Sequence, residues 1–200
     1  MKGTPESRRD VEAPAARCDA RMRAVILVGF MGAGKTSVGR ALSTRLGWRF
    51  EDLDDWIQMR EGRTVAEIFR DSGEREFRRA EHAALLEIVK DAGPGVPLVL
   101  ALGGGAFLEA ENFSLLVGET TPTVYLDADA EELWRRCGTD PIERPLRRDE
   151  QTFYELYRMR RPGYLRAQIR VETGGREIEQ IVNEIVDRLL LESPQQGDVT

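Results

Sequence analysis

The chain has 200 residues, enough for one compact domain with its own hydrophobic core. Its composition, 41% hydrophobic and 32% charged, excludes a disordered chain, a collagen and a coiled-coil rod. It carries 29 Lys and Arg against 35 Asp and Glu, a formal net charge of −6. This balance disfavours duplex nucleic acid as a partner, because proteins that bind its phosphates are normally basic.

The first 21 residues differ in character from the rest of the chain. They are polar, mix acidic residues with arginines and contain no apolar stretch of the kind found in a secretory signal. We expect residues 1–21 to be a disordered leader, 22–192 to form the domain and 193–200 to be a flexible tail. The two cysteines, Cys18 and Cys137, lack metal-binding spacing and favour a reducing compartment. Since no apolar run is long enough to cross a bilayer, we expect a cytoplasmic protein with no membrane partner.

Short apolar runs alternate with longer helical patterns from residue 22 onward. The predicted elements in chain order are strand 24–28, helix 35–46, strand 48–50, helices 55–60, 64–69 and 74–91, strands 98–102 and 123–126, helices 131–136 and 151–161, strand 169–171 and helix 177–191. This alternation predicts an α/β fold, with a mostly parallel sheet covered on both faces by helices. In such folds the site lies at the carboxyl ends of the strands, here just after residues 28, 50 and 102.

A glycine-rich motif follows the first predicted strand. Residues Gly29–Thr36 fit the pattern G-x-x-x-x-G-K-[ST] and stand between a buried strand and a helix, as a phosphate-binding P-loop requires. Glycines let the loop fold around an anion with its backbone N–H groups pointing inward, and the helix adds its positive dipole end. Lys35 supplies a charge for the β- and γ-phosphates, and the Thr36 hydroxyl is a candidate Mg²⁺ ligand. The motif predicts nucleotide binding.

The rest of the chain narrows the class of nucleotide-binding protein. A regulatory GTPase carries an N-K-x-D motif, and this chain contains no Asn-Lys pair. A mechanical ATPase usually has an apolar strand that ends in Asp-Glu, whereas the segment Val124–Asp127 lacks the Glu. The simpler interpretation of Asp127 is a helix cap, and the alternative is a strand end that holds Mg²⁺. A small kinase is the class that remains.

Two carboxylates close the second predicted strand. At strand spacing Asp52 and Asp54 face the same side, so both can point into one cleft. One can hold Mg²⁺, directly or through water, and the other can accept or orient the proton of a substrate hydroxyl. The alternative is that Asp54 only caps the next helix.

Two further features stand where a substrate pocket would lie. Arg78 and Glu81 are i, i+3 partners on one helix face, which would hold the guanidinium in one orientation; a solvated ion pair that includes Glu74 has the same pattern. The glycines Gly103–Gly105 end a buried strand, and bare backbone there permits close approach of a ligand. Their alternative is an ordinary turn between a strand and a helix.

These motifs together resemble one family. The shared segments are Gly29–Thr36 with Ser37–Arg40, Asp52–Asp54, Gly62–Phe69, Gly73–Glu74, Glu76–Arg78 and Leu102–Ala106. They occur in the order and spacing of shikimate kinases, over about residues 22–172. The resemblance implies a three-layer P-loop kinase fold with a central parallel sheet of about five strands and a mobile lid near residues 138–150. It implies the reaction ATP + shikimate → shikimate 3-phosphate + ADP, in aromatic amino-acid synthesis.

The resemblance also implies a substrate site. Asp54 is similar to the carboxylate that binds and activates the shikimate 3-hydroxyl, and Arg78 to an arginine that binds the substrate carboxylate. Gly103, Gly104 and Gly105 resemble the glycines that line that pocket. Arg160 resembles the second arginine on the carboxylate, with Arg161 as the alternative register.

A nucleotide site is implied in the same way. Its expected residues are Gly32, Ala33, Gly34, Lys35, Thr36, Ser37, Arg136 and Arg144. Arg136 is similar to an adenine-contacting arginine, and Arg144, in the lid, to one that reaches the transferred phosphate. Thr36 and Asp52 are the expected metal ligands, with Mg²⁺ as the cofactor of ATP. The catalytic set is then Lys35, Asp54 and Arg144.

Two other functions stay open at this point. One is phosphorylation of a different small hydroxy acid, of the gluconate type. The other is nucleotide binding without catalysis, against which the presence of Lys35, Asp52, Asp54, Arg78 and Arg144 argues. We expect a monomer that acts on ATP and shikimate.

Overall fold

A computed structural model describes residues 22, 24–92, 97–118, 121–139 and 149–192. The predictions for the leader 1–21, for the tail 193–200 and for most of the lid segment, Arg144 included, lie outside the described residues.

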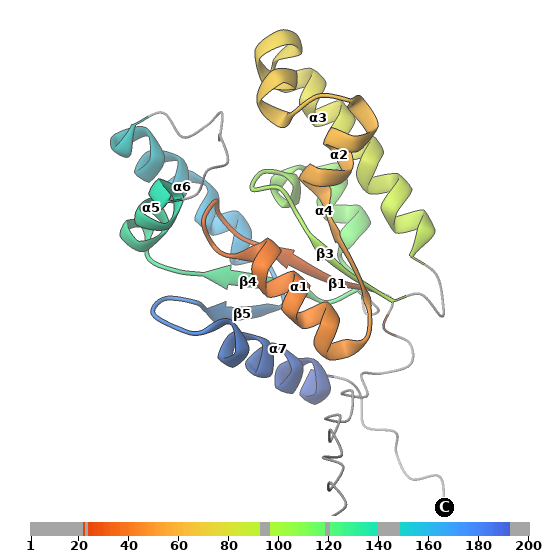
Figure 1. Ribbon diagram of the computed structural model, residues 1–200, viewed down its shortest axis with the longest axis vertical. Coiled ribbons are helices and arrows are strands. Elements are labelled where there is room, and N and C mark those ends of the chain that lie inside the picture. Colours follow the sequence, from red (N-terminus) through yellow and green to blue (C-terminus); the bar gives the residue numbers. More distant parts are fainter. Residues whose placement is uncertain (1–21, 23, 93–96, 119–120, 140–148, 193–200) are drawn as a thin grey trace, which may run out of the picture.

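A five-stranded parallel sheet forms the centre of the molecule (Figure 1). Its strands stand in the order β2-β3-β1-β4-β5, and all neighbours pair in parallel. The strands are β1 (Ala24–Val28), β2 (Arg49–Asp52), β3 (Leu98–Ala101), β4 (Thr123–Asp127) and β5 (Ile169–Glu172). All five residues of the central strand β1, Ala-Val-Ile-Leu-Val, are buried, because helices cover both faces of the sheet. The predicted α/β fold is confirmed.

The helices form the two outer layers. They are α1 (Lys35–Leu46), α2 (Leu53–Glu61), α3 (Val65–Asp91), α4 (Ala110–Leu116), α5 (Ala130–Thr139), α6 (Glu150–Tyr164) and α7 (Ile178–Glu192), with a 3-10 turn η1 (Ala106–Leu108). Helices α1 and α7 pack side by side against one face of the sheet (Figure 1). Helix α2 packs on α3, and η1 contacts α3, α4 and α6. The segment that follows β3 therefore meets helices from both halves of the chain.

Glycines and a capping box explain where helices α1 and α3 begin, end or bend. Helix α1 ends at Gly47, which adopts a left-handed conformation with φ 69°. Helix α3 begins with a capping box, in which Thr64 and Glu67 bond each other's backbone N–H groups. The two helices expected over 64–69 and 74–91 form one element with a kink at Gly73, whose φ of 80° lies outside the helical region.

Two parts of the fold differ from the prediction. Helix α4 and the turn η1 were not expected, because both are short and Glu109, the cap residue of α4, makes no side-chain cap bond that would mark a start. Helix α6 runs three residues past its predicted end at 161, through Pro162. The buried Tyr164 packs against the sheet and holds this last turn in place.

Candidate active site

The P-loop forms an open anion cradle at the carboxyl end of β1. Gly34 is the cap residue of helix α1, with φ 86°, and as a glycine it supplies no side-chain cap bond to the first N–H groups of that helix. A left-handed residue is needed there, and glycine adopts that conformation without strain. The Lys35 ammonium donates to the carbonyls of Gly29 and Phe30, at 3.0 Å each, and so lies across the loop. A helix N-terminus with a fixed ammonium beside it is the arrangement that binds phosphate.

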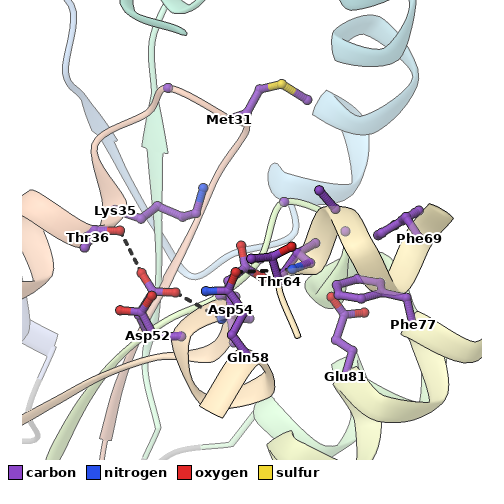
Figure 2. Close-up of a pocket in the computed structure, with 18 of the residues that line it drawn as sticks. Met31, Lys35, Thr36, Asp52, Asp54, Gln58, Thr64, Phe69, Phe77 and Glu81 are labelled. Atoms are coloured by element: carbon purple, nitrogen blue, oxygen red, sulfur yellow. Dashed lines mark hydrogen bonds between the residues drawn. The ribbon is translucent and has the colours of Figure 1, made fainter. Parts of the chain in front are cut away.

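One cavity of about 760 Å³ joins this loop to α2 and α3 (Figure 2). The predicted site residues that line it are Gly32, Gly34, Lys35, Thr36, Ser37, Asp52, Asp54, Arg78, Gly103, Gly104, Gly105, Arg136 and Arg160. Ala33 is instead buried in the core. The structure therefore brings the nucleotide half and the substrate half of the predicted site to one space.

The two aspartates reach the cavity by a different geometry from the predicted one. Asp52 ends β2 and is the cap residue of α2: its Oδ1 accepts from the Asp54 N–H at 3.0 Å. Asp54 lies in the first turn of that helix, so the expectation that both carboxylates share a strand face is wrong, as is the assignment of the cap to Asp54. The other Asp52 oxygen, Oδ2, accepts from the Thr36 hydroxyl at 2.7 Å (Figure 2). Asp52 thus connects the P-loop to β2.

Bare glycine backbone brings two side chains close to the loop after β3. A Cβ added to Gly103 would stand 2.7 Å from Asp54 Oδ1, and one added to Gly105 would overlap the Arg78 guanidinium. Asp54 and Arg78 therefore rest with their polar atoms close to the glycine segment, and all of these residues line the cavity.

Three carboxylates surround Arg78. Its Nη1 donates to Glu81 at 2.7 Å, its Nη2 donates to Glu74 at 3.2 Å, and Glu109 lies 3.7 Å from its Nε. Burial works against the charge of Arg78, but the facing carboxylates of Glu81 and Glu74 outweigh it and raise the pKa. The guanidinium stays charged and fixed in direction.

Glu81 is a member of the site that the sequence did not reveal as such. Its side chain is 1% exposed, it lines the cavity, and within the described part of the chain its Oε1 has no hydrogen-bond partner. Burial raises the pKa of Glu81 to about 7, although the Arg78 guanidinium favours the charged form. The i, i+3 spacing to Arg78 was visible in the sequence, but the burial was not.

The raised pKa of Glu81 predicts a specific dependence of stability on pH. Between its ordinary pKa of 4.5 and about 7, folded Glu81 keeps a proton that the unfolded chain releases. The stability that this group contributes is present below pH 4.5 and is lost as pH rises toward 7, by up to about 3 kcal/mol at 1.36 kcal/mol per pKa unit. Urea unfolding from pH 4.5 to 8 should therefore show a decline in the wild type that is smaller in Glu81→Gln. A difference between the two proteins that does not change with pH would contradict the shift.

The two candidate arginines of α6 point in different directions. Arg160 lines the cavity and its Nη1 donates to the Gly104 carbonyl at 3.3 Å. Arg161 bonds Asp127 at 2.9 Å and, within the described residues, does not line the cavity. The Tyr164 hydroxyl also donates to the Gly104 carbonyl.

Arg136 belongs to the site, whereas Asp127, in the described part of the chain, lies outside the cavity lining. Arg136 lines the cavity and donates to Glu132 at 2.6 Å and to the Thr173 carbonyl at 2.8 Å. Asp127 is buried and bonds Tyr125, Arg161 and Arg170, and α5 begins only at residue 130, so the expectation that Asp127 caps a helix is wrong.

The fold and the cavity define a class of protein. A P-loop at the carboxyl end of a parallel sheet faces a pocket with carboxylates and paired arginines, and this combination belongs to P-loop kinases of small molecules.

Comparison with known proteins gives the family. The family model for shikimate kinase matches residues 31–190. A shikimate kinase of Thermus thermophilus is 41% identical over 177 residues, 86% of this chain and 93% of that protein, and one of Persephonella marina is 38% identical over 169 residues, 84% of this chain and 99% of that protein. The chain belongs to the shikimate kinase family.

Solved structures agree with this family. The structure of shikimate kinase from Acinetobacter baumannii in complex with shikimate superposes with a TM-score of 0.79 at 34% identity, over 87% of this chain and 96% of that one. A gluconokinase from Sinorhizobium meliloti matches with a TM-score of 0.54 at 18% identity, over 84% of this chain and 93% of that one, and so shares the fold alone. Among the described residues no helix is both long and apolar enough to span a membrane.

Proposed function

We propose that this chain transfers the γ-phosphoryl group of ATP to the 3-hydroxyl of shikimate, giving shikimate 3-phosphate and ADP. One observation carries the proposal: Lys35 in the phosphate cradle, Asp54 and Arg78 line the same cavity. A phosphoryl group can therefore pass from one half of the cavity to the other without a large movement of either substrate. Phosphoryl transfer depends mainly on positioning and on neutralising charge, which this arrangement supplies.

The nucleotide half of the cavity fits Mg²⁺ together with ATP. The Thr36 hydroxyl and the Asp52 carboxylate, 2.7 Å apart, are oxygen donors beside the phosphate cradle. The described residues contain no group of three or more His, Cys, Asp or Glu side chains that could hold a metal ion. Magnesium bound with a nucleotide usually takes only one or two protein ligands and shares the rest with phosphate oxygens and water. When bound, Mg²⁺ would neutralise charge on the β- and γ-phosphates, and Lys35 would add to this from the loop.

The substrate half fits a hydroxylated carboxylic acid. Arg78 and Arg160 would bind the substrate carboxylate, because planar guanidinium groups donate to carboxylates in pairs. Asp54 would accept the proton of the reacting hydroxyl and align its oxygen with the phosphorus. Glu81 Oε1, buried at the cavity and without a partner in the described residues, would accept from a second hydroxyl. A substrate with one carboxylate and several hydroxyls satisfies all of these groups.

Other parts of the proposal rest on the resemblance to the family. We propose that residues 138–150 form a lid whose Arg144 reaches the transferred phosphate, and that Arg136 contacts adenine. We also propose that residues 22–192 are one domain and that the protein is a cytoplasmic monomer.

A coupled assay tests the activity. Purified protein with Mg-ATP should release ADP rapidly with shikimate, and the product should carry phosphate on the 3-oxygen by NMR. Gluconate, offered at the same concentration, should give less than about 1% of that rate, because its hydroxyls lie on an open chain and no ring holds the reacting hydroxyl at a fixed place relative to the carboxylate. Chelation of Mg²⁺ with EDTA should abolish turnover, and excess Mg²⁺ should restore it.

Two outcomes would contradict the proposal. Faster ADP release with gluconate would favour a kinase of another hydroxy acid. ATP binding without turnover on any of the acids would favour a nucleotide-binding module without catalysis.

A further inference from the structure

The end of α6 that carries Arg160 is a weak helical segment. Pro162 has no backbone N–H, so it cannot bond the carbonyl four residues earlier, and Gly163 has the lowest helix propensity after proline. Leu108 of η1 packs where a Gly163 side chain would stand. Pro162 and Gly163 therefore make this turn intrinsically weak as a helix, and side-chain contacts add to the backbone bonds that position Arg160.

One set of contacts joins this turn to the substrate loop. Arg160 and Tyr164, four residues apart and so on the same face of the helix, both donate to the Gly104 carbonyl. The Tyr164 ring is fully buried and stacks on Tyr125 of β4, with 5.4 Å between ring centroids. These contacts bring Arg160 to the cavity from one side.

A second contact holds the turn from the other side. Arg161 Nη2 donates to Asp127 Oδ2 at 2.9 Å, at the end of β4. The Asp127 side chain is 3% exposed, and its Oδ1 accepts from the Tyr125 hydroxyl at 2.6 Å. Burial and Asp127 raise the pKa of Tyr125, so the Tyr125 hydroxyl keeps its proton and donates a hydrogen bond to Asp127. This hydrogen bond holds the Asp127 carboxylate in place at the end of β4. A fixed, buried acceptor can set the direction of Arg161, unlike a mobile surface pair.

We propose that Asp127 and Arg161 form a positioning pair for substrate recognition: by holding the last turn of α6 on β4, they direct the neighbouring Arg160 into the cavity. Among the described residues neither member of the pair lines the cavity, so both act through Arg160. The inference rests on the proposed function, in which Arg160 binds the substrate carboxylate.

The chain offers a matched control for a purely structural role. Arg170 of β5 donates to the same Asp127 oxygen, Oδ2, at the same 2.9 Å, and its side chain is 48% exposed against 35% for Arg161. Arg170 also pairs with Glu172, but it is not on the helix that carries Arg160. After loss of either arginine, Asp127 keeps the other arginine and Tyr125 as donors, so both variants should fold.

Steady-state kinetics of Arg161→Met and Arg170→Met test the pair. Arg161→Met should raise the KM for shikimate by about 10-fold or more, with the KM for ATP within about twofold and kcat within about threefold of wild type. Arg170→Met should leave all three within about twofold. Arg161→Lys, which keeps the charge on Asp127, should recover most of the shikimate affinity.

A second measurement does not depend on which substrate is used. Hydrogen exchange of backbone amides in residues 158–167 should be faster in Arg161→Met and unchanged in Arg170→Met. Equal exchange in the two variants, or a rise in the KM for ATP that matches the rise for shikimate, would overturn the positioning role. If wild-type protein fails to phosphorylate shikimate, the proposed function fails, while the exchange comparison still decides whether the pair holds this turn. Should Arg161→Met not fold, Arg161→Gln and Arg170→Gln provide the same comparison, because each removes one charged partner of Asp127 and leaves the other.

Discussion

Asp54→Asn is expected to lower kcat for shikimate by about 10²- to 10⁴-fold, the usual contribution of a general base. The Asp54 carboxylate rests against Gly103 and lines the cavity between Lys35 and Arg78. Asparagine has nearly the same shape, so it would still occupy this place, but its amide cannot take a proton from the reacting hydroxyl. The KM for ATP should stay within about twofold of wild type, because the P-loop is untouched. Stopped-flow and steady-state kinetics, with ATP binding measured by calorimetry, give both quantities.

The adjacent Asp55 is a suitable control for that experiment. It also lines the cavity and lies in the same turn of α2, but it pairs with the exposed Arg40 at 3.8 Å. Asp55→Asn removes a negative charge from nearly the same place and should change kcat by less than about threefold. Near-normal turnover in Asp54→Asn would remove Asp54 from the mechanism. A similar loss in both variants would point to the total charge of the cavity instead of to one base.

The parts of this molecule that follow local rules could be predicted from the sequence. The P-loop is set by glycine spacing between an apolar strand and a helix, and its Lys35 and Thr36 lie where the motif requires. The sheet follows from runs such as Ala24–Val28, which are too apolar to have any exposed face. Both features depend on neighbours in the chain, so the prediction needed no knowledge of distant contacts.

The features that the sequence concealed depend on distant contacts. The strand β2 ends at Asp52, not at residue 50, and α2 begins at the next residue. The backbone therefore changes from strand to helix between Asp52 and Asp54, and the rule that alternate residues of a strand face the same side does not apply to them. The burial of Glu81 depends on how α3 packs against the loop after β3. The local sequence around Asp127 indicates a helix cap, because its partners Arg161 and Arg170 are more than 30 residues away in the chain. In each case the sequence contained the residue, but its environment comes from the tertiary packing.

Arg78→Ala is expected to raise the KM for shikimate by about 100-fold or more. A charge-assisted pair between guanidinium and carboxylate contributes on the order of 3 kcal/mol when it is shielded from water, and each 1.4 kcal/mol is a factor of ten. The KM for ATP should change little, because Arg78 belongs to the substrate half of the cavity. Arg78→Lys, which keeps the charge but not the planar fork, should give an intermediate KM.

The same substitution also affects folding, and a second variant separates the two effects. Without Arg78, the buried Glu81 loses the cation beside it, so its pKa rises above about 7 and the protein should be least stable at alkaline pH. The double variant Arg78→Met with Glu81→Gln has no buried charge at either position, and its stability in urea should recover toward that of wild type. Its KM for shikimate should remain high, because the guanidinium that binds the carboxylate is still absent. If the double variant instead recovered shikimate affinity, the loss in Arg78→Ala would come from the uncompensated Glu81, and Arg78 would have no direct contact with the substrate.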